Sequence, residues 1–370
     1  LRPVGLEPVV HRRLVADVEL VAGRGEDRRE SLELESAYDR RTHEAPVACD
    51  VDSGRLRQLV HDSLIFPQPP IYERIPRLID RRDLPKTLQS LDDNRRSSVR
   101  NRSKHEVSQR DTRSFPSPPD GRHGWPWTGD DRSPLVPSAK DPAAPSVTVI
   151  TASFNQGTYL EEAVRSVILQ DHPHLEYLVF DGGSTDESVA ILKRYEPWIS
   201  SWVSEPDGGQ ADAINRGFEQ STGEYLCWLN ADDVLYQGFL SRRVAEFAAR
   251  PTTDLIYGDV DFGWNDREKS LLRGKALSFA EMLRSLDVAV PQQSAMWRRA
   301  TVQRLGGLDP RWHVVLDREF FLRIIRSRTA EYIPGSCGFF RQHEGAKSVA
   351  ETTVWVDELP MMYTEFFAQE

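Results

Sequence analysis

The chain has 370 residues, of which 39% are hydrophobic and 28% charged, and its formal net charge is −10. This length is enough for roughly two domains with a sizeable core, so an enzyme is possible on size alone. The acidic balance does not suggest a nucleic-acid binder, and no apolar run approaches the roughly 18 residues that a membrane-spanning helix needs.

The first 113 residues show few sustained apolar patterns. Between residues 92 and 113 the sequence is almost wholly polar, which predicts a poorly structured, largely irregular leader. An alternative is that these residues are not part of the native protein. Residues 114–145 are dense in proline, which predicts an extended linker along a surface, with Trp125 and Trp127 as its anchors.

From residue 146 the pattern changes to alternating strands and helices. Apolar, β-branched runs of strand length alternate with amphipathic helical stretches. The predicted strands cover 147–154, 176–180, 199–204, 225–229 and 254–262, and the predicted helices cover 159–169, 187–195, 210–219 and 238–249. This order predicts an α/β domain in which helices flank a mixed, mostly parallel sheet.

Shorter elements complete the predicted domain, which extends from residue 146 to residue 348. We expect a helix at 279–286, a strand at 294–297, a short helix from Arg299 and an amphipathic helix at 317–326. Residues 349–370 form a C-terminal tail that we expect to be helical. The three cysteines are widely spaced and match no zinc pattern, which favours a reducing compartment and a cytoplasmic location, including the inner face of the membrane.

Polar residues follow four of the predicted strands at the point where each strand ends. Ser153 and Asn155 follow the first, and the later groups lie at 181–186, 205–210 and 230–233. In a parallel α/β sheet the ligand lies at the carboxyl ends of the strands, so we expect these residues to meet in one crevice. Each loop alone could equally be a turn or a helix cap, but four of them together favour a site.

Asp232 and Asp233 come directly after an apolar strand. Adjacent like charges need a counterion, and Mg²⁺ or Mn²⁺ supplies it with positions left open for phosphate oxygens. Residues 146–370 carry 33 acidic and 22 basic side chains, so a diphosphate is easier to hold there through a cation than through a basic cleft. The alternative is that Asp232 caps the following helix while Asp233 points into water.

Three segments resemble the family 2 glycosyltransferases of the GT-A (Rossmann-like) fold, in the order and spacing of that family. They are VTVITASFNQGTYLEEAVRSVILQDHPHLEYLVFDGGSTDES, VSEPDGGQADAINRGF and GEYLCWLNADD, within a match over roughly residues 145–348. The resemblance implies inverting transfer of a sugar from a nucleotide-diphosphate sugar to a hydroxyl acceptor, with Mn²⁺ or Mg²⁺ as cofactor. It also implies a glycan or lipid-linked acceptor, bacterial surface polysaccharide or glycolipid assembly, and peripheral membrane contact.

The resemblance also implies roles for single residues. Asp317, in VLDREFFLR, matches the catalytic base of the family, and Asp233 and His343 match metal-binding positions. The implied donor-binding residues are Ala152, Ser153, Asn155, Asp181, Gly183, Ser184, Gln210, Ala213, Asn215, Asn230 and Asp232. Glu319 and Asp309 are alternatives for the base, and Asp317 could equally cap its helix.

Other classes of protein fit the sequence less well. A nucleotidyltransferase normally has a glycine-rich phosphate loop and a basic residue after its first strand, and a nicotinamide-dependent dehydrogenase has G-x-G-x-x-G there. The sequence SFNQG at 153–157 offers neither pattern. A catalytically silent sugar-nucleotide-binding or scaffold protein would be favoured if Asp233 or Asp317 were replaced. Both are present, so the sequence favours an active transferase, and the base at Asp317 favours inversion.

Overall fold

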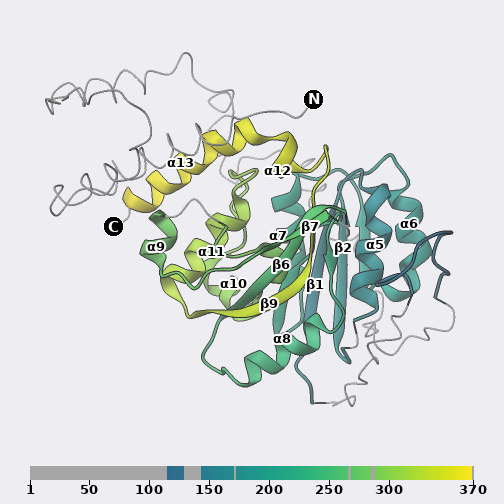
Figure 1. Ribbon diagram of the computed structural model, residues 1–370, viewed down its shortest axis with the longest axis horizontal. Helices are drawn as coiled ribbons and strands as arrows, with labels where there is room; N and C mark the ends of the chain where they lie inside the picture. Colours follow the sequence, from purple (N-terminus) through teal and green to yellow (C-terminus); the bar gives the residue numbers. More distant parts are fainter. Residues whose placement is uncertain (1–114, 129–142, 171, 266–267, 285–287, 369–370) are drawn as a thin grey trace, which may run out of the picture. The chain divides into compact units, whose positions relative to one another are not determined.

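A computed structural model of the chain describes residues 115–128, 143–170, 172–265, 268–284 and 288–368 (Figure 1). The predicted leader at 1–113 and residues 129–142 of the predicted linker lie outside these ranges. In the described part, helices flank a mixed, mostly parallel sheet, so the predicted α/β architecture is confirmed.

The first half of the sheet is parallel. Strand β1 (Val147–Ser153) lies between β2 (Leu175–Asp181) and β4 (Tyr225–Trp228), and β3 (Ser201–Ser204) pairs with the outer side of β2. All but one of the β1 residues are buried, as expected for a central parallel strand that is covered on both faces. The connecting helices are α5 (Gly157–Ile168), α6 (Ser188–Tyr195), η5 (Glu196–Trp198) and α7 (Gln210–Gln220).

The second half of the sheet is mixed. Strand β8 (Met296–Arg298) pairs antiparallel with β4 and with β6 (Leu255–Asn265), and β9 (Ala330–Arg341) runs parallel to β6. The sequence did not predict β9, because this segment contains a proline and two glycines, which disfavour strands. The other elements are β5 (Val234–Leu235), α8 (Phe239–Ala248), β7 (Glu268–Leu272), α9 (Phe279–Arg284), η6 (Gln292–Ser294), α10 (Arg299–Leu305), α11 (Leu316–Ser327), α12 (Lys347–Ala350) and α13 (Thr352–Ala368).

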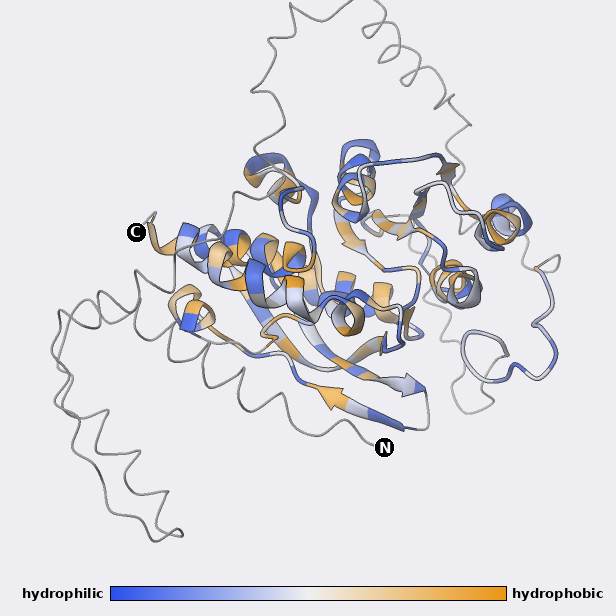
Figure 2. Ribbon diagram, turned by 90° about the horizontal axis from the view of Figure 1, so that it is seen from above, coloured by the Kyte–Doolittle hydropathy of each residue, from blue (hydrophilic) through white to orange (hydrophobic). Residues whose placement is uncertain are grey.

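An aromatic cluster packs α11 against the sheet near the end of β4. Trp228, the last residue of β4, stacks on Phe321 with ring centroids 6.0 Å apart, and Trp297 packs edge-on against Trp228 at 5.3 Å. Figure 2 shows orange and blue residues mixed along the helices, as expected for helices that bury one face. The loop at residues 230–233, called the acidic loop below, follows Trp228, and Asp317 lies one turn before Phe321. This packing therefore places the start of α11 at the same end of the sheet as the acidic loop.

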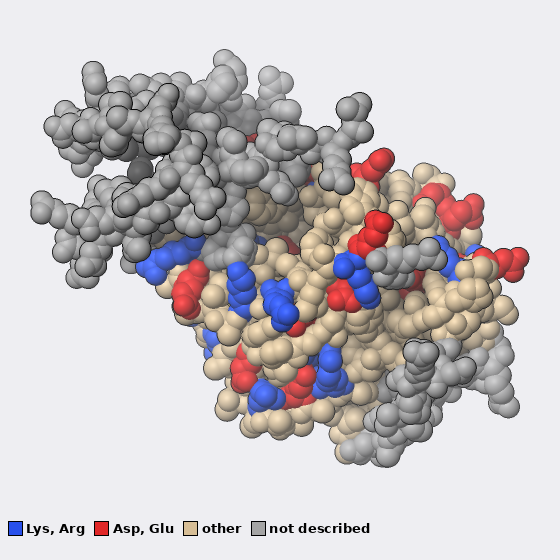
Figure 3. Space-filling model, in the orientation of Figure 1, with Lys and Arg blue, Asp and Glu red and all other residues tan. Residues whose placement is uncertain are grey.

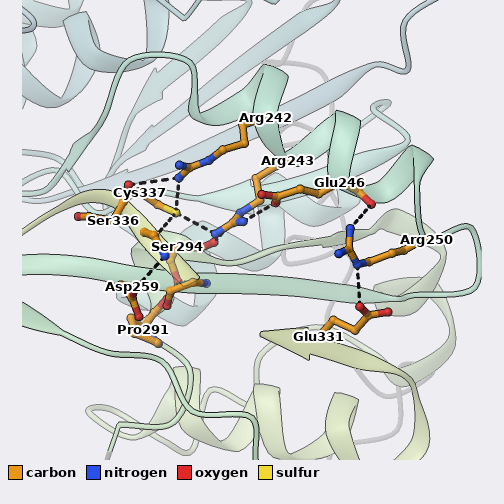
Figure 4. Close-up of polar contacts among 12 residues, drawn as sticks. Arg242, Arg243, Glu246, Arg250, Asp259, Pro291, Ser294, Glu331, Ser336 and Cys337 are labelled. Atoms are coloured by element: carbon orange, nitrogen blue, oxygen red, sulfur yellow. Dashed lines mark hydrogen bonds and ion pairs between the residues drawn. The ribbon is translucent and has the colours of Figure 1, made fainter. Parts of the chain in front are cut away.

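A buried arginine anchors α8 to the sheet (Figure 4). The fully buried Arg243 donates from Nε to the Ser294 carbonyl at 3.1 Å and from Nη2 to Cys337 Sγ at 2.8 Å, and Nη1 pairs with Glu246 at 2.5 Å. A guanidinium can be buried when its donors find partners, as they do here. Ser294 belongs to η6, so this contact also fixes the two glutamines of η6, which lie at the candidate site.

Residues 115–128 dock on α5. Arg165 donates from its guanidinium to the carbonyls of Pro116, Pro126 and Trp127 at 2.8–3.2 Å. Trp125 Nε1 donates to a carbonyl of β5 at 2.7 Å, and Trp127 is 7% exposed. This part of the predicted linker therefore packs as a fixed part of the α/β unit.

The C-terminal helix α13 shares the core of the domain. Leu359, Met362 and Tyr363 belong to the same apolar cluster as the aromatic residues of α11, so the predicted boundary at residue 348 does not separate two bodies. On the face shown in Figure 3, acidic and basic side chains are interspersed. None of the described helices is both long and apolar enough to cross a membrane.

Candidate functional site

The loop after β4 holds one buried and one accessible carboxylate. Asp233 is 1% exposed and accepts hydrogen bonds from Gln293 Nε2 at 2.8 Å, from the Arg341 backbone N–H at 2.9 Å and from Asn230 Nδ2 at 3.1 Å. Burial, with the charge of the neighbouring Asp232, raises the pKa of Asp233. Asp233 therefore organises the loop from inside.

Asp232 faces outward, toward His343. Its Oδ2 lies 3.1 Å from His343 Nε2, and the two side chains are 18% and 14% exposed. The His343 ring also packs against the ring of Tyr159 on α5, with centroids 4.5 Å apart. Asp232 and His343 are therefore two neighbouring side chains of this site that stay partly accessible to a ligand.

Arg341, at the end of β9, is turned inward. Its Nε donates to the Asp232 carbonyl at 2.9 Å, Nη2 pairs with Glu162 of α5 at 3.0 Å, and the guanidinium lies over the Tyr159 ring at 5.2 Å. Arg341 is 9% exposed. Its side chain therefore supports the acidic loop.

A second polar group lies at the ends of β1 and β2. Asp181 accepts hydrogen bonds from the Ser184 N–H, from Ser184 Oγ and from Ser204 Oγ at 2.6–2.9 Å. Asn155 has a φ of 52°, and its Oδ1 accepts from the Thr185 N–H at 2.9 Å. Asparagine tolerates this left-handed conformation better than most residues. Through these hydrogen bonds, Asp181 and Asn155 fix the conformation of the loop at 182–185.

Gly183 is required by the backbone of that loop. Its φ is 84°, and an added Cβ would lie 3.1 Å from the Pro206 nitrogen. The loops after β2 and β3 therefore approach each other more closely than a residue with a side chain allows.

Two features of this region point to a ligand. Ser153 is 5% exposed, and its hydroxyl has no hydrogen-bond partner among the described residues. A buried hydroxyl without a partner is unfavourable, so a donor or acceptor from a bound molecule would satisfy it. The neighbouring Phe154 is 60% exposed and, together with Asp207, flanks Gly182. Both residues lie at or just after the ends of predicted strands, and Asp207 belongs to the predicted group at 205–210, but neither was predicted to bind the donor. An aromatic side chain beside a polar strand end could have indicated a stacking position.

The remaining predicted donor residues divide into two groups. Gln210, at the start of α7, donates from Nε2 to Asn230 Oδ1 at 2.9 Å, so it joins the acidic loop. Ala152 and Ala213 pack with the core, and Asn215 makes two hydrogen bonds with the backbone of Leu308. Donor contacts by Ala152, Ala213 and Asn215 stay predictions.

Asp317 is the second residue of α11. Its Oδ1 accepts from the Arg318 N–H at 2.7 Å, and burial raises its pKa. The helix is capped at Val315, so Asp317 is not the N-cap residue. The alternatives for the base are both held in ion pairs, Glu319 with Arg323 at 2.6 Å and Asp309 with Arg311 at 2.7 Å. These contacts favour Asp317 among the three carboxylates.

The acidic loop suits a divalent cation bound together with a ligand. Across the described ranges, no three His, Cys, Asp or Glu side chains form a ready-made metal site. Asp232 and His343 offer an oxygen and a nitrogen ligand within 3.1 Å of each other. A cation that binds phosphate needs only one or two protein ligands, because phosphate and water oxygens complete its shell. The residues therefore fit Mg²⁺ or Mn²⁺, with Asp232 better placed than the predicted Asp233.

Comparison with known proteins places these motifs among glycosyltransferases. The family described as Glycosyl transferase family 2 matches residues 148–302. An uncharacterised glycosyltransferase of Mycobacterium tuberculosis (strain CDC 1551 / Oshkosh) is 35% identical over 186 residues, which are 49% of this chain and 69% of that protein. A PGL/p-HBAD biosynthesis glycosyltransferase of Mycobacterium bovis (strain BCG / Pasteur 1173P2) is 31% identical over 49% of this chain and 70% of its own length.

Solved structures show a weaker likeness. Staphylococcus aureus TarS 1-349 in complex with UDP-GlcNAc has a TM-score of 0.46 and 17% identity, over 58% of this chain and 66% of that one. The mannosyltransferase PcManGT from Pyrobaculum calidifontis, in complex with GDP-Man and Mn²⁺, has a TM-score of 0.43 and 22% identity, over 58% and 62%. The chain thus spans less than two thirds of each of these solved chains.

Proposed function

This chain belongs to glycosyl transferase family 2, and we propose that it transfers a sugar from a nucleotide-diphosphate sugar to a hydroxyl acceptor with inversion at the anomeric carbon. The observation that carries the proposal is the partly exposed pair of Asp232, which follows β4, and His343, whose ring packs on Tyr159 in the helix that follows the neighbouring strand β1. Ligands of parallel α/β sheets bind at this end.

The nucleotide of the donor is proposed to lie over the loops after β1 and β2. Phe154 would stack on the base, and the Ser153 hydroxyl would gain a partner. A base-aromatic stack contributes about 1–3 kcal/mol. Asp207, whose pKa is raised by burial, lies across Gly182 from Phe154 and would accept a hydrogen bond from a base N–H. The adjacent Gln210 links this region to the acidic loop.

The diphosphate of the donor is proposed to reach Asp232 and His343. These residues would hold Mg²⁺ or Mn²⁺, which when bound offsets the negative charge of the departing diphosphate. The protein's own contribution is to fix the two ligands. Tyr159 packs against the His343 ring, and Arg341 holds the carbonyl of Asp232. Fixed ligands favour the transition state because they need no rearrangement as charge develops.

Asp317 is the proposed general base. It would accept the proton of the acceptor hydroxyl while that oxygen attacks the anomeric carbon, and the bond from the anomeric carbon to the diphosphate oxygen breaks on the opposite face. This in-line displacement inverts the configuration. A pKa raised by burial brings a carboxylate closer to the range in which a base works efficiently. A glycan or lipid-linked glycan hydroxyl is the proposed acceptor, in keeping with a relative named for PGL/p-HBAD biosynthesis.

The test is binding and turnover of a panel of nucleotide sugars with Mn²⁺, with Mg²⁺ and with a chelator. Intact protein should turn over at least one donor only when a cation is present. The Asp317→Asn variant should keep donor affinity and lose turnover, and Asp232→Asn should need at least about 10-fold more Mn²⁺ for half-maximal turnover. If no donor binds under any of these conditions, the transferase function is wrong for this chain.

A further inference from the structure

Helix α13 reaches the start of α11 through one carboxylate. Glu358 accepts the backbone N–H of His313 on Oε1 at 2.8 Å, and the N–H groups of Val314 and Val315 on Oε2 at 2.9 and 3.2 Å. Val315 is the N-cap residue of α11 and has no side chain that can accept a hydrogen bond. Glu358 therefore satisfies, from another helix, the N–H of the N-cap residue of α11 and those of the two residues before it.

The same loop is held from α12 and its neighbour. Lys347 Nζ donates to the His313 carbonyl at 3.1 Å, and His313 Nε2 lies 2.7 Å from Glu351 Oε2. The charge of Lys347 interacts with Glu351, Glu358 and Asp317. This cation offsets the acidic groups gathered at the start of α11, which the positive end of the helix dipole also favours.

We propose that Glu358 is a positioning residue for Asp317, and this inference rests on the proposed function. Asp317 follows Val315 by two residues, so the direction of its carboxylate depends on the path of the backbone at 313–315. Both oxygens of Glu358 define that path. The acceptor hydroxyl must lie within hydrogen-bond reach of the base, and a displacement of about 1 Å at a catalytic group can cost about 100-fold in rate.

The contacts of Glu358 differ from those that dock the helix. Leu359, Met362 and Tyr363 bury α13 in the core, and Arg318 donates to Tyr363 Oη at 2.7 Å. A change at position 358 therefore leaves the apolar attachment of α13 in place. The expected effect falls on the loop before α11 and on the base that follows it.

The matched control is Glu365 on the same helix. Its carboxylate pairs with the Arg311 side chain at 2.9 Å, and those two side chains are 44% and 62% exposed. Glu358→Gln and Glu365→Gln each remove one negative charge from α13. Only the first removes an acceptor from backbone N–H groups, because an amide offers one acceptor oxygen in place of two.

The experiment compares full-length wild type, Glu358→Gln, Glu365→Gln and Asp317→Asn. We expect Glu358→Gln to lower kcat for transfer by about 10- to 100-fold, with the donor Kd and the donor KM within twofold of wild type. Hydrogen exchange should become faster at the amides of residues 313–315. Glu365→Gln should leave kcat within twofold and leave exchange at these amides unchanged.

Two outcomes would overturn the inference while leaving the proposed function intact. One is a wild-type kcat in Glu358→Gln although exchange at 313–315 is accelerated. The other is an equal loss of kcat in Glu358→Gln and Glu365→Gln with equal falls in Tm, which indicates general destabilisation. Absence of turnover in the wild type, or full transfer activity in Asp317→Asn, would instead overturn the proposed function and this inference with it.

Discussion

The replacement Glu162→Gln should destabilise the protein because it leaves a buried guanidinium without its ion partner. Glu162 is 8% exposed and Arg341 is 9% exposed, and their charged atoms lie 3.0 Å apart. Arg122 also lies near Glu162, at 3.8 Å, and its side chain is 48% exposed. Removing one partner of a buried pair costs about 3–5 kcal/mol, and the glutamine oxygen keeps one acceptor, so we expect a loss of about 2–3 kcal/mol.

The neighbouring residue provides the control. Glu161 also lies on α5, and its side chain is 13% exposed. It pairs with Arg194 at 3.1 Å and accepts from Tyr195 Oη at 2.8 Å, but the Arg194 side chain is 48% exposed. The Arg194 guanidinium stays in water when Glu161 is replaced, and a glutamine oxygen can still accept from Tyr195. Glu161→Gln should therefore cost about 1 kcal/mol, less than Glu162→Gln. Urea unfolding followed by circular dichroism, with two independent preparations of each variant, measures both free energies of unfolding.

Glu162→Gln should also weaken the binding of Mn²⁺. Without Glu162 the Arg341 guanidinium is held less firmly. Its Nε donates to the carbonyl of Asp232, and the Arg341 backbone N–H donates to the carboxylate of Asp233. Electron paramagnetic resonance counts free Mn²⁺ in the presence of a saturating nucleoside diphosphate, and we expect an affinity about 10-fold lower. Equal free energies of unfolding for Glu161→Gln and Glu162→Gln would refute the reasoning about burial, and unchanged Mn²⁺ affinity would refute the link to the acidic loop.

Three further predictions concern the site itself. Asp317→Asn should lower kcat about 100- to 10,000-fold without changing donor affinity. Because the base must be ionised and burial raises the pKa of Asp317, wild-type transfer should fall as the pH drops through that raised pKa. A pH–rate profile without an acid limb would contradict this role of Asp317. Asp232→Asn should raise the Mn²⁺ concentration for half-maximal activity at least about 10-fold, measured by metal titration. A larger increase in Asp233→Asn, with the same Tm in both variants, would show that Asp233 binds the cation. Phe154→Ala should weaken nucleoside diphosphate binding by about 5- to 100-fold in calorimetry, whereas an unchanged Kd would exclude stacking.

Local patterns in the sequence were sufficient for the family and for the order of the first elements, and they predicted a site at the carboxyl ends of the parallel strands. Apolar runs of strand length and amphipathic helical stretches depend on neighbouring residues, so the strands β1 to β4 could be predicted to within a few residues. The polar loops that follow these strands meet because parallel strands end at one edge, a consequence of topology that holds without side-chain detail.

The tertiary structure alone decided which residues support the site. Strand β9 forms because β6 and β5 supply its hydrogen bonds, against the preferences of its own proline and glycines. Arg341 meets Asp233 across 108 positions of the chain, and Glu358 meets Val315 across 43. Contacts between residues so distant leave no periodicity or spacing in the sequence. A buried charge or N–H group without a partner is costly. The folded chain therefore places a partner beside each of these groups, however far apart the two residues are in the sequence.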